Sequence, residues 1–225
     1  MLDAALVVAL VIAGVAIVAI MVMAYRMFFS QSLMDNSEDD PWTEPLFNAL
    51  AIVAVLAFCS WFNLRLIGAP VSLEMNVTGA IVPIFISAYL LVNVRAGWRR
   101  YLLAITAVAA LGYLATDMGP QGVYIHVGLW ILVVAACATL SYLLAKGDLR
   151  QALALAYVSA SLGMLFGGDV LQLVGYTTYM GVYVIGIGGL MDFVFLSGVV
   201  AVALIASAHY LVAFARSHMA ARQRA

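Results

Sequence analysis

Long runs of apolar residues, interrupted by short polar connections, dominate the pattern along this chain. A helix needs about 20 predominantly apolar residues to cross the hydrocarbon core of a bilayer. Seven segments come close to that length or exceed it, and we predict that each is a transmembrane helix. They are residues 4–29, 46–67, 77–94, 101–116, 122–145, 151–173 and 191–215. The pattern therefore predicts an all-α, polytopic membrane protein that forms one integral membrane domain over residues 1–225.

Residues 174–190 form a glycine-rich apolar stretch ahead of the last predicted helix. The stretch is too short to hold a spanning helix and two turns, so we predict a re-entrant or interfacial segment. Non-helical backbone is tolerated at membrane depth only where protein or a water-filled cavity covers it. The first segment is expected to be a retained helix and not a signal peptide, because it has an acid, Asp3, and no basic residue before it.

Basic residues fall mostly on one side of the seven predicted helices. If the helices alternate in direction, only Arg65 among the ten Lys and Arg residues lies on the other side. Cytoplasmic connections of membrane proteins carry an excess of Lys and Arg. We therefore expect a multi-pass protein of the cell (inner) membrane, with the N-terminus outside and the C-terminus in the cytoplasm. The basic residues on the cytoplasmic side are Arg26, Arg95, Arg99, Arg100, Lys146, Arg150, Arg216, Arg222 and Arg224.

Composition agrees with a membrane location and excludes several other classes. Hydrophobic residues make up 66% of the chain, charged residues 9%, and the mean hydropathy is +1.10, whereas roughly half of a soluble domain is apolar. A formal net charge of −1 provides no surface for nucleic acid, so the lipid bilayer is the expected partner. The two cysteines, Cys59 and Cys137, lie in apolar runs and are expected to pack there. No cofactor or metal motif is present, and the only lysine, Lys146, lies in a connection, which excludes a retinal Schiff base in the last helix.

Two acids, Asp169 and Asp192, lie within glycine-rich apolar sequence. A carboxylate in hydrocarbon is costly and usually marks a functional site. If the two carboxyls meet, one shared proton relieves their repulsion. That pair can activate water and polarise a peptide carbonyl, as in an aspartyl protease, or it can bind and release a proton or cation during transport. The residues leave both uses open, together with a non-catalytic subunit of a larger membrane complex.

Further residues are candidates to line a cavity around the two acids. The predicted topology places Glu74 and Asp117 in the same, non-cytoplasmic half as Asp169 and Asp192. A proline inside a membrane helix frees a carbonyl about one turn earlier and kinks the helix. The alternatives are a simple kink at Pro83, a turn around Asp117, a hydrogen-bonded core histidine, and glycines that serve only helix packing. The candidate lining residues are Asn76, Pro83, Asp117, His126, Gly168 and Gly189.

Four blocks, in this order, resemble a prokaryotic membrane family, the domain of unknown function 1614. They are residues 76–90 (NVTGAIVPIFISAYL), residues 156–173 (AYVSASLGMLFGGDVLQL), residues 185–198 (IGIGGLMDFVFLSG) and the helical tail after these. The resemblance extends over about residues 46–212. It implies the fold of that family and no established activity.

Residues 189–197 (GLMDFVFLS) are also similar to a stretch of the GxGD intramembrane aspartyl proteases, the class of presenilin and signal peptide peptidase. This likeness implies a catalytic role for Asp192, with Asp169 as the partner acid and a transmembrane peptide as substrate. The stretch departs from the protease pattern at Met191, where that class has its second glycine. Before the partner acid, Gly168 stands where that class has a tyrosine. The interpretations that remain are a protease, a proton- or cation-coupled transporter, and a subunit held by partner membrane proteins.

Overall fold

The computed structural model describes residues 52–67, 72–119, 122–173 and 182–222. The chain divides into two compact units, Met1–Phe58 and Cys59–Ala225. Of the first unit only residues 52–58 are described, and they are helical. The predicted helix at residues 4–29 lies outside the described residues. Among the described residues, the strands and the other helices belong to the second unit.

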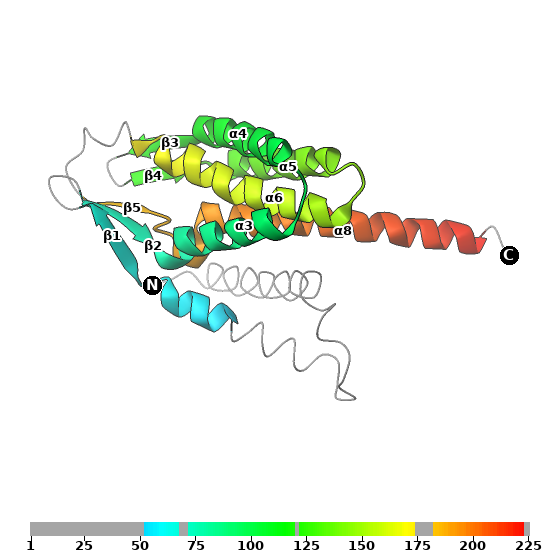
Figure 1. The fold of residues 1–225 in the computed structure, drawn as a ribbon, viewed down its shortest axis with the longest axis horizontal. Coiled ribbons are helices and arrows are strands. Elements are labelled where there is room, and N and C mark those ends of the chain that lie inside the picture. Colours follow the sequence, from blue (N-terminus) through cyan, green and yellow to red (C-terminus); the bar gives the residue numbers. More distant parts are fainter. Residues whose placement is uncertain (1–51, 68–71, 120–121, 174–181, 223–225) are drawn as a thin grey trace. The chain divides into compact units, whose positions relative to one another are not determined.

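Helices dominate the second unit, and short strands lie between them (Figure 1). In chain order the elements are β1 (Asn63–Ile67), β2 (Ser72–Asn76), the π-helical turn η1 (Val77–Ile81), α3 (Val82–Asn93), α4 (Trp98–Ala115), β3 (Thr116–Gly119), β4 (Gly122–Ile125), α5 (Val127–Leu144), α6 (Leu149–Met164), the π-helical turn η2 (Leu165–Val170), β5 (Val182–Ile185), the 3₁₀ turn η3 (Gly189–Met191) and α8 (Phe193–Arg222).

Helix α6 is the centre of the bundle and packs against α3, α4, α5 and α8. Within the described residues, three segments are long and apolar enough to cross a membrane: Val127–Leu144, Leu149–Val170 and Phe193–Val212. In the second of these, which contains α6, 78% of the residues are buried, against 28% in α5. Because α5 exposes mostly apolar side chains, its outer face suits lipid and not water.

Glycines allow α4 and α6 to approach closely. A Cβ atom at Gly167 would overlap the backbone carbonyl of Ala109, and one at Gly163 would overlap the side chain of Val108. Small residues at such contacts let membrane helices pack backbone to backbone. Gly163 and Gly167 therefore serve helix packing, which was one of the two interpretations of the glycines before Asp169.

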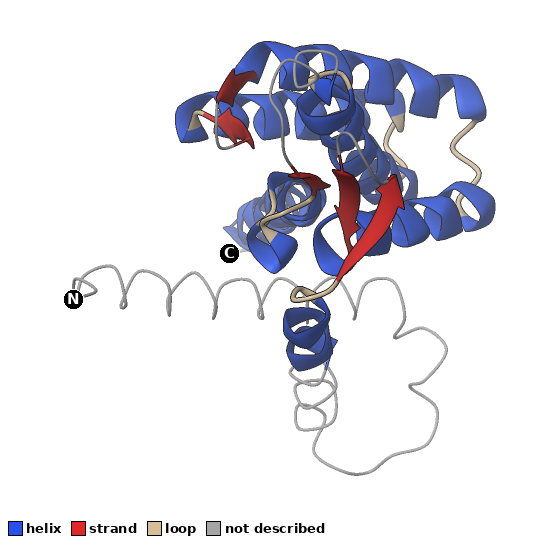
Figure 2. Ribbon diagram, turned by 90° about the vertical axis from the view of Figure 1, so that its left-hand side faces the viewer, coloured by secondary structure: helices blue, strands red, loops and turns tan. Residues whose placement is uncertain are grey.

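Two small sheets lie at one end of the helices, opposite the turns that join α3 to α4 and α5 to α6 (Figures 1 and 2). One sheet has the order β1-β2-β5, and the other is the hairpin β3-β4. Strand β2 pairs antiparallel with β1 and parallel with β5. In the hairpin, Thr116 pairs with Ile125. These strands form the end of the unit where the candidate site lies.

The prediction of a mostly helical fold is therefore confirmed, but short strands replace helix or turn in several of the predicted segments. The predicted second helix, residues 46–67, ends at residue 59, and β1 comes after it. The predicted fifth helix begins with strand β4, and the predicted turn after α4 is strand β3. Within residues 174–190, the described part holds β5, a turn and η3. A short apolar run does not reveal by periodicity whether it is strand or helix, because both bury it equally well.

Pro83 lies at the start of α3 and not at a kink in its middle. The N–H of Val82 donates to the carbonyl of Val77, five residues earlier, so the preceding turn is π-helical. Proline has no N–H to donate and blocks the carbonyl four residues before it. The change from the π turn to the α-helix at this point accommodates the proline.

Candidate functional site

A pocket of about 90 Å³ opens at the strand end of the bundle. Its walls come from the hairpin β3-β4, the π turn η2, strand β5 and the first residues of α8. Asp169 and Asp192 both line it, and so does Gly168. Elements that are distant in sequence therefore bring the two acids to one small space.

Asp169 lies in η2 and is held by the segment that begins with β5. The Tyr183 hydroxyl donates to the main-chain oxygen of Asp169 at 3.0 Å, and the Gly186 N–H hydrogen-bonds the Asp169 carboxyl. The Oδ2 atom of Asp169 is buried and has no hydrogen-bond partner among the described residues. Buried polar atoms almost always have a partner, and this oxygen is one of five buried side-chain atoms that have none among the described residues.

The backbone of Gly186 is set by a contact with Gly79 in η1. Gly186 has φ +73°, and a Cβ on either glycine would overlap the backbone of the other. Only glycine combines that left-handed conformation with so close an approach. The contact places the Gly186 N–H beside Asp169.

Asp192 caps the N-terminus of α8. Its Oδ1 accepts from the N–H of Val194 at 2.8 Å, and its Oδ2 accepts from the N–H of Gly188 at 3.1 Å. An aspartate in this position stabilises a helix by accepting N–H groups that have no intrahelical partner. The sequence signal for this structural role is an aspartate directly before a long apolar helix.

The pocket contains acidic groups without basic ones. No Lys, Arg or His is among the described residues that line it, whereas Asp169 and Asp192 both do. An ionised carboxylate in such a place is unfavourable unless its charge is compensated. A bound proton or a bound cation supplies that compensation.

Asn76, Pro83 and Gly189 do not line the pocket. Asn76 is 2% exposed and caps η1, accepting from the N–H groups of Thr78 and Gly79. Gly189 has φ +57°, and a Cβ there would overlap Ser60. Of the six residues proposed to line a cavity around the acids, Gly168 is the one that lines this pocket.

A comparison with known protein families finds a match over the part of the chain that contains Asp169 and Asp192. Residues 57–204 match the family described as "Protein of unknown function (DUF1614)". The chain belongs to this family. The match confirms the resemblance seen in the sequence blocks, within narrower limits than residues 46–212. No curated protein and no solved structure matches the chain, and the likeness to the GxGD proteases gains no support.

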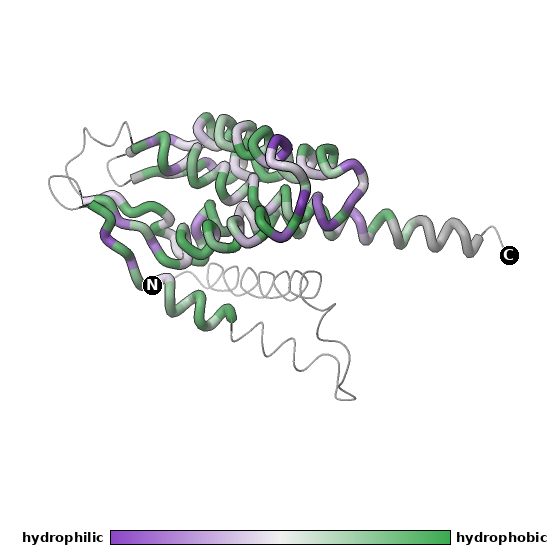
Figure 3. Tube along the Cα trace, viewed as in Figure 1, coloured by the Kyte–Doolittle hydropathy of each residue, from purple (hydrophilic) through white to green (hydrophobic). Residues whose placement is uncertain are grey.

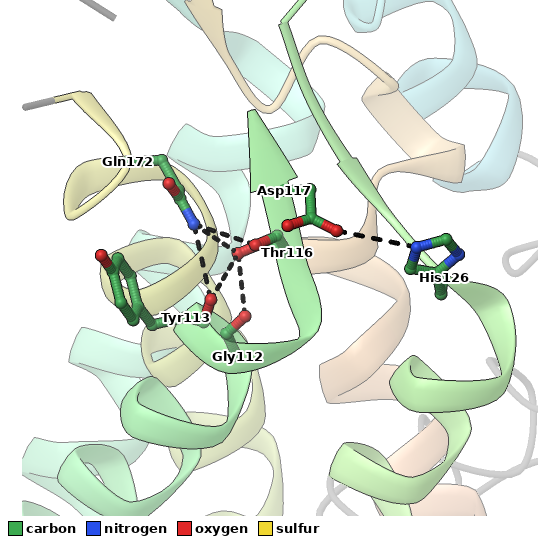
Figure 4. Close-up of polar contacts among 6 residues, drawn as sticks. All are labelled: Gly112, Tyr113, Thr116, Asp117, His126 and Gln172. Carbon is green, nitrogen blue, oxygen red and sulfur yellow. Dashed lines mark hydrogen bonds and ion pairs between the residues drawn. The ribbon is translucent and has the colours of Figure 1, made fainter. Parts of the chain in front are cut away.

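In the DUF1614 chain, Asp117 on strand β3 and His126, directly after β4, form an exposed pair (Figure 4). The Asp117 Oδ2 lies 3.6 Å from the His126 Nε2, and the two side chains are 61% and 64% exposed. His126 immediately precedes α5, because β4 occupies the start of the predicted helix. Both side chains are thus exposed, and neither lines the pocket.

Gln172, which the sequence did not single out, ties η2 to the hairpin. Its Nε2 donates to the main-chain oxygen of Thr116 at 3.1 Å and to the Thr116 Oγ1 at 3.0 Å. The Thr116 hydroxyl in turn donates to the carbonyl of Gly112 at 2.9 Å. Thr116 lines the pocket, so these bonds fix the wall that faces Asp169.

Glu74 lies in the three-stranded sheet of the DUF1614 chain and does not reach the pocket. Its Oε1 is 3.3 Å from the Nε of Arg65, on the neighbouring strand. The four acids that the topology placed in one half of the membrane therefore do not converge. Two of them share the pocket, and the other two form surface pairs with basic partners.

Proposed function

We propose that this membrane protein binds a proton or a small cation reversibly at Asp169, as the coupling site of a transporter. The observation that carries the proposal is the buried Oδ2 of Asp169, which has no partner among the described residues and lies in a pocket with a second carboxyl and no described basic side chain. Intramembrane acids of this kind are typical of ion pathways and proton relays.

The size of the pocket supports an ion over a peptide. A volume of about 90 Å³ holds a few water molecules, each of which takes roughly 30 Å³ in the liquid. Pockets for larger ligands run from about 300 to 1,000 Å³. A transmembrane peptide substrate needs far more room beside the two acids.

The hydrogen bonds of Asp192 also favour ion binding over peptide cleavage. Both of its oxygens accept main-chain N–H groups, whereas the acids of an aspartyl protease must handle a water molecule and a proton between them. Asp192 is therefore suited to remain a fixed negative charge beside the proton or cation bound at Asp169. The intramembrane protease is the weaker interpretation.

Infrared difference spectroscopy of the purified protein tests binding directly. Stepping the pH is expected to change a carboxylic-acid C=O band in the wild type, and Asp169→Asn is expected to remove that band. Asp117→Asn is the matched control, because Asp117 is an exposed acid outside the pocket. An Asp169→Asn spectrum identical to that of the wild type would contradict the proposal.

We also propose seven spans with the N-terminus outside and the C-terminus in the cytoplasm. The basic turns after α3 and α5 lie at the end opposite the pocket, which favours a cytoplasmic location for that end. Reporter fusions after Arg100, Arg150 and Arg216 are expected to report the cytoplasm, and fusions near Glu74 and Asp117 the opposite face. A cytoplasmic signal at Asp117 would remove one span from this topology.

A further inference from the structure

We infer that the end of the bundle opposite the pocket binds the headgroups of anionic phospholipids. The binding surface, here named the basic end, consists of the turn between α3 and α4, the turn between α5 and α6, and the first residues of α4 and α6. Its basic residues are Arg95, Arg99, Arg100, Lys146 and Arg150. This inference concerns a different surface from the proposed ion site and does not depend on it.

The two turns of the basic end are held side by side, although about 50 residues separate them in sequence. The Nη1 of Arg100 donates to the Oε1 of Gln151 at 3.2 Å, which joins the start of α4 to the start of α6. Figures 1 and 2 both show the two turns at the same end of the helices. Cations from two separate segments therefore form one surface.

Positive charge on this surface is exposed and almost uncompensated. Arg95, Arg99, Lys146 and Arg150 are exposed, and Arg100 is half-buried. The only acid in these turns, Asp148, accepts at Oδ1 and Oδ2 from the main-chain and side-chain nitrogens of Gln151. Its carboxylate is thus occupied in capping α6, and none of the ion pairs found in the described part of the chain involves the five cations.

The strand end of the same unit has the opposite charge. It carries Glu74, Asp117, Asp169 and Asp192 against the single arginine Arg65, which pairs with Glu74. If the net charge of the whole unit attracted anions, their binding would not be confined to one end. The asymmetry directs an anionic partner to the basic end alone.

The expected position of the basic end at the membrane surface favours lipid headgroups as its partner. Trp98 is 67% exposed and comes after the first turn, and the guanidinium of Arg99 lies 5.8 Å from its ring centre. Tryptophan favours the interface between hydrocarbon and water, where its ring lies at headgroup level. Figure 3 shows hydrophilic residues at these turns and hydrophobic residues along the helices that lead to them. The cations are therefore placed where lipid phosphates lie. Each basic residue near an anionic membrane surface adds to the attraction between the protein and the lipid.

Thermal unfolding of the full-length protein in a neutral detergent, with added lipid, tests the inference. Phosphatidylglycerol is expected to raise the melting temperature more than phosphatidylcholine at the same concentration. The triple variant Arg95→Gln, Arg99→Gln, Lys146→Gln is expected to lose more than roughly half of that difference, since three of five cations are removed. Arg65→Gln is the matched control and is expected to keep the full difference.

Three results would overturn the inference. They are equal shifts from the two lipids, an undiminished shift in the triple variant, and an equal shift from inorganic phosphate, which would assign the site to a free anion. If the triple variant does not fold, the wild type decides alone. Its phosphatidylglycerol shift must then shrink as sodium chloride is added, because salt screens exposed charges, and a shift that ignores salt contradicts the inference.

Discussion

Asp169→Asn is expected to reduce ion flux through reconstituted vesicles to the level of protein-free vesicles. The substitution keeps the size of the side chain but removes the group that takes up a proton or balances a cation. It also leaves the hydroxyl of Tyr183 bonded to the main-chain oxygen of residue 169, so the π turn keeps its anchor. The expected loss is therefore one of function and not of folding.

The measurement is made with a pH-sensitive dye inside the vesicles and an imposed gradient of protons, sodium or potassium in separate arms. Asp117→Asn is the matched control and is expected to match the wild type, because Asp117 lies outside the pocket. Asp192→Asn is a poorer test. An amide nitrogen would replace one of two oxygens that accept main-chain N–H groups, and loss of a helix cap destabilises the fold.

Two outcomes would contradict the transport proposal. One is wild-type flux through Asp169→Asn in all three arms. The other is cleavage of a helical peptide by the wild type and not by Asp169→Asn, which would restore the protease interpretation.

Asn76→Ala is expected to cause the largest loss of stability among single substitutions outside the pocket. The Nδ2 of Asn76 donates to Ser60 O and Asn63 Oδ1, each at 2.8 Å, and more weakly to Phe62 O at 3.4 Å. Its Oδ1 accepts from the N–H groups that begin η1. Leaving a buried donor or acceptor without a partner costs about 1–3 kcal/mol, so the total is a large share of a typical stability of about 5–15 kcal/mol.

Thermal unfolding in detergent, followed by circular dichroism, measures this loss. Asn93→Ala is the matched control, because Asn93 is exposed and its Nδ2 makes one local bond, to the carbonyl of Tyr89. Asn76→Asp is expected to be at least as destabilising as Asn76→Ala, because a buried carboxylate oxygen would face the acceptor oxygens that Nδ2 now bonds. Equal melting temperatures for Asn76→Ala and Asn93→Ala would show that the cap contributes little.

The apolar pattern by itself predicted a lipid environment for this protein and the positions of most of its helices. Runs such as residues 77–94 and 101–116 are too apolar and too long for a soluble loop, and α3 and α4 occupy most of these two runs. The order of the glycine- and aspartate-containing blocks determined the family. The same pattern singled out Asp169 and Asp192, because an acid in apolar sequence is costly wherever the chain folds.

The tertiary structure alone decided the backbone of the short apolar runs and the separate roles of the two acids. Strand β2 finds its partner β5 more than a hundred residues later, and hydropathy carries no information about such pairing. Asp192 became a helix cap because η3 and α8 direct their N–H groups at it. Asp169 kept one oxygen without a partner among the described residues, where the Gly186 N–H reaches its carboxyl. Sequence reports the cost of burying a carboxylate, but the hydrogen bonds that offset this cost depend on which backbone groups the fold brings near.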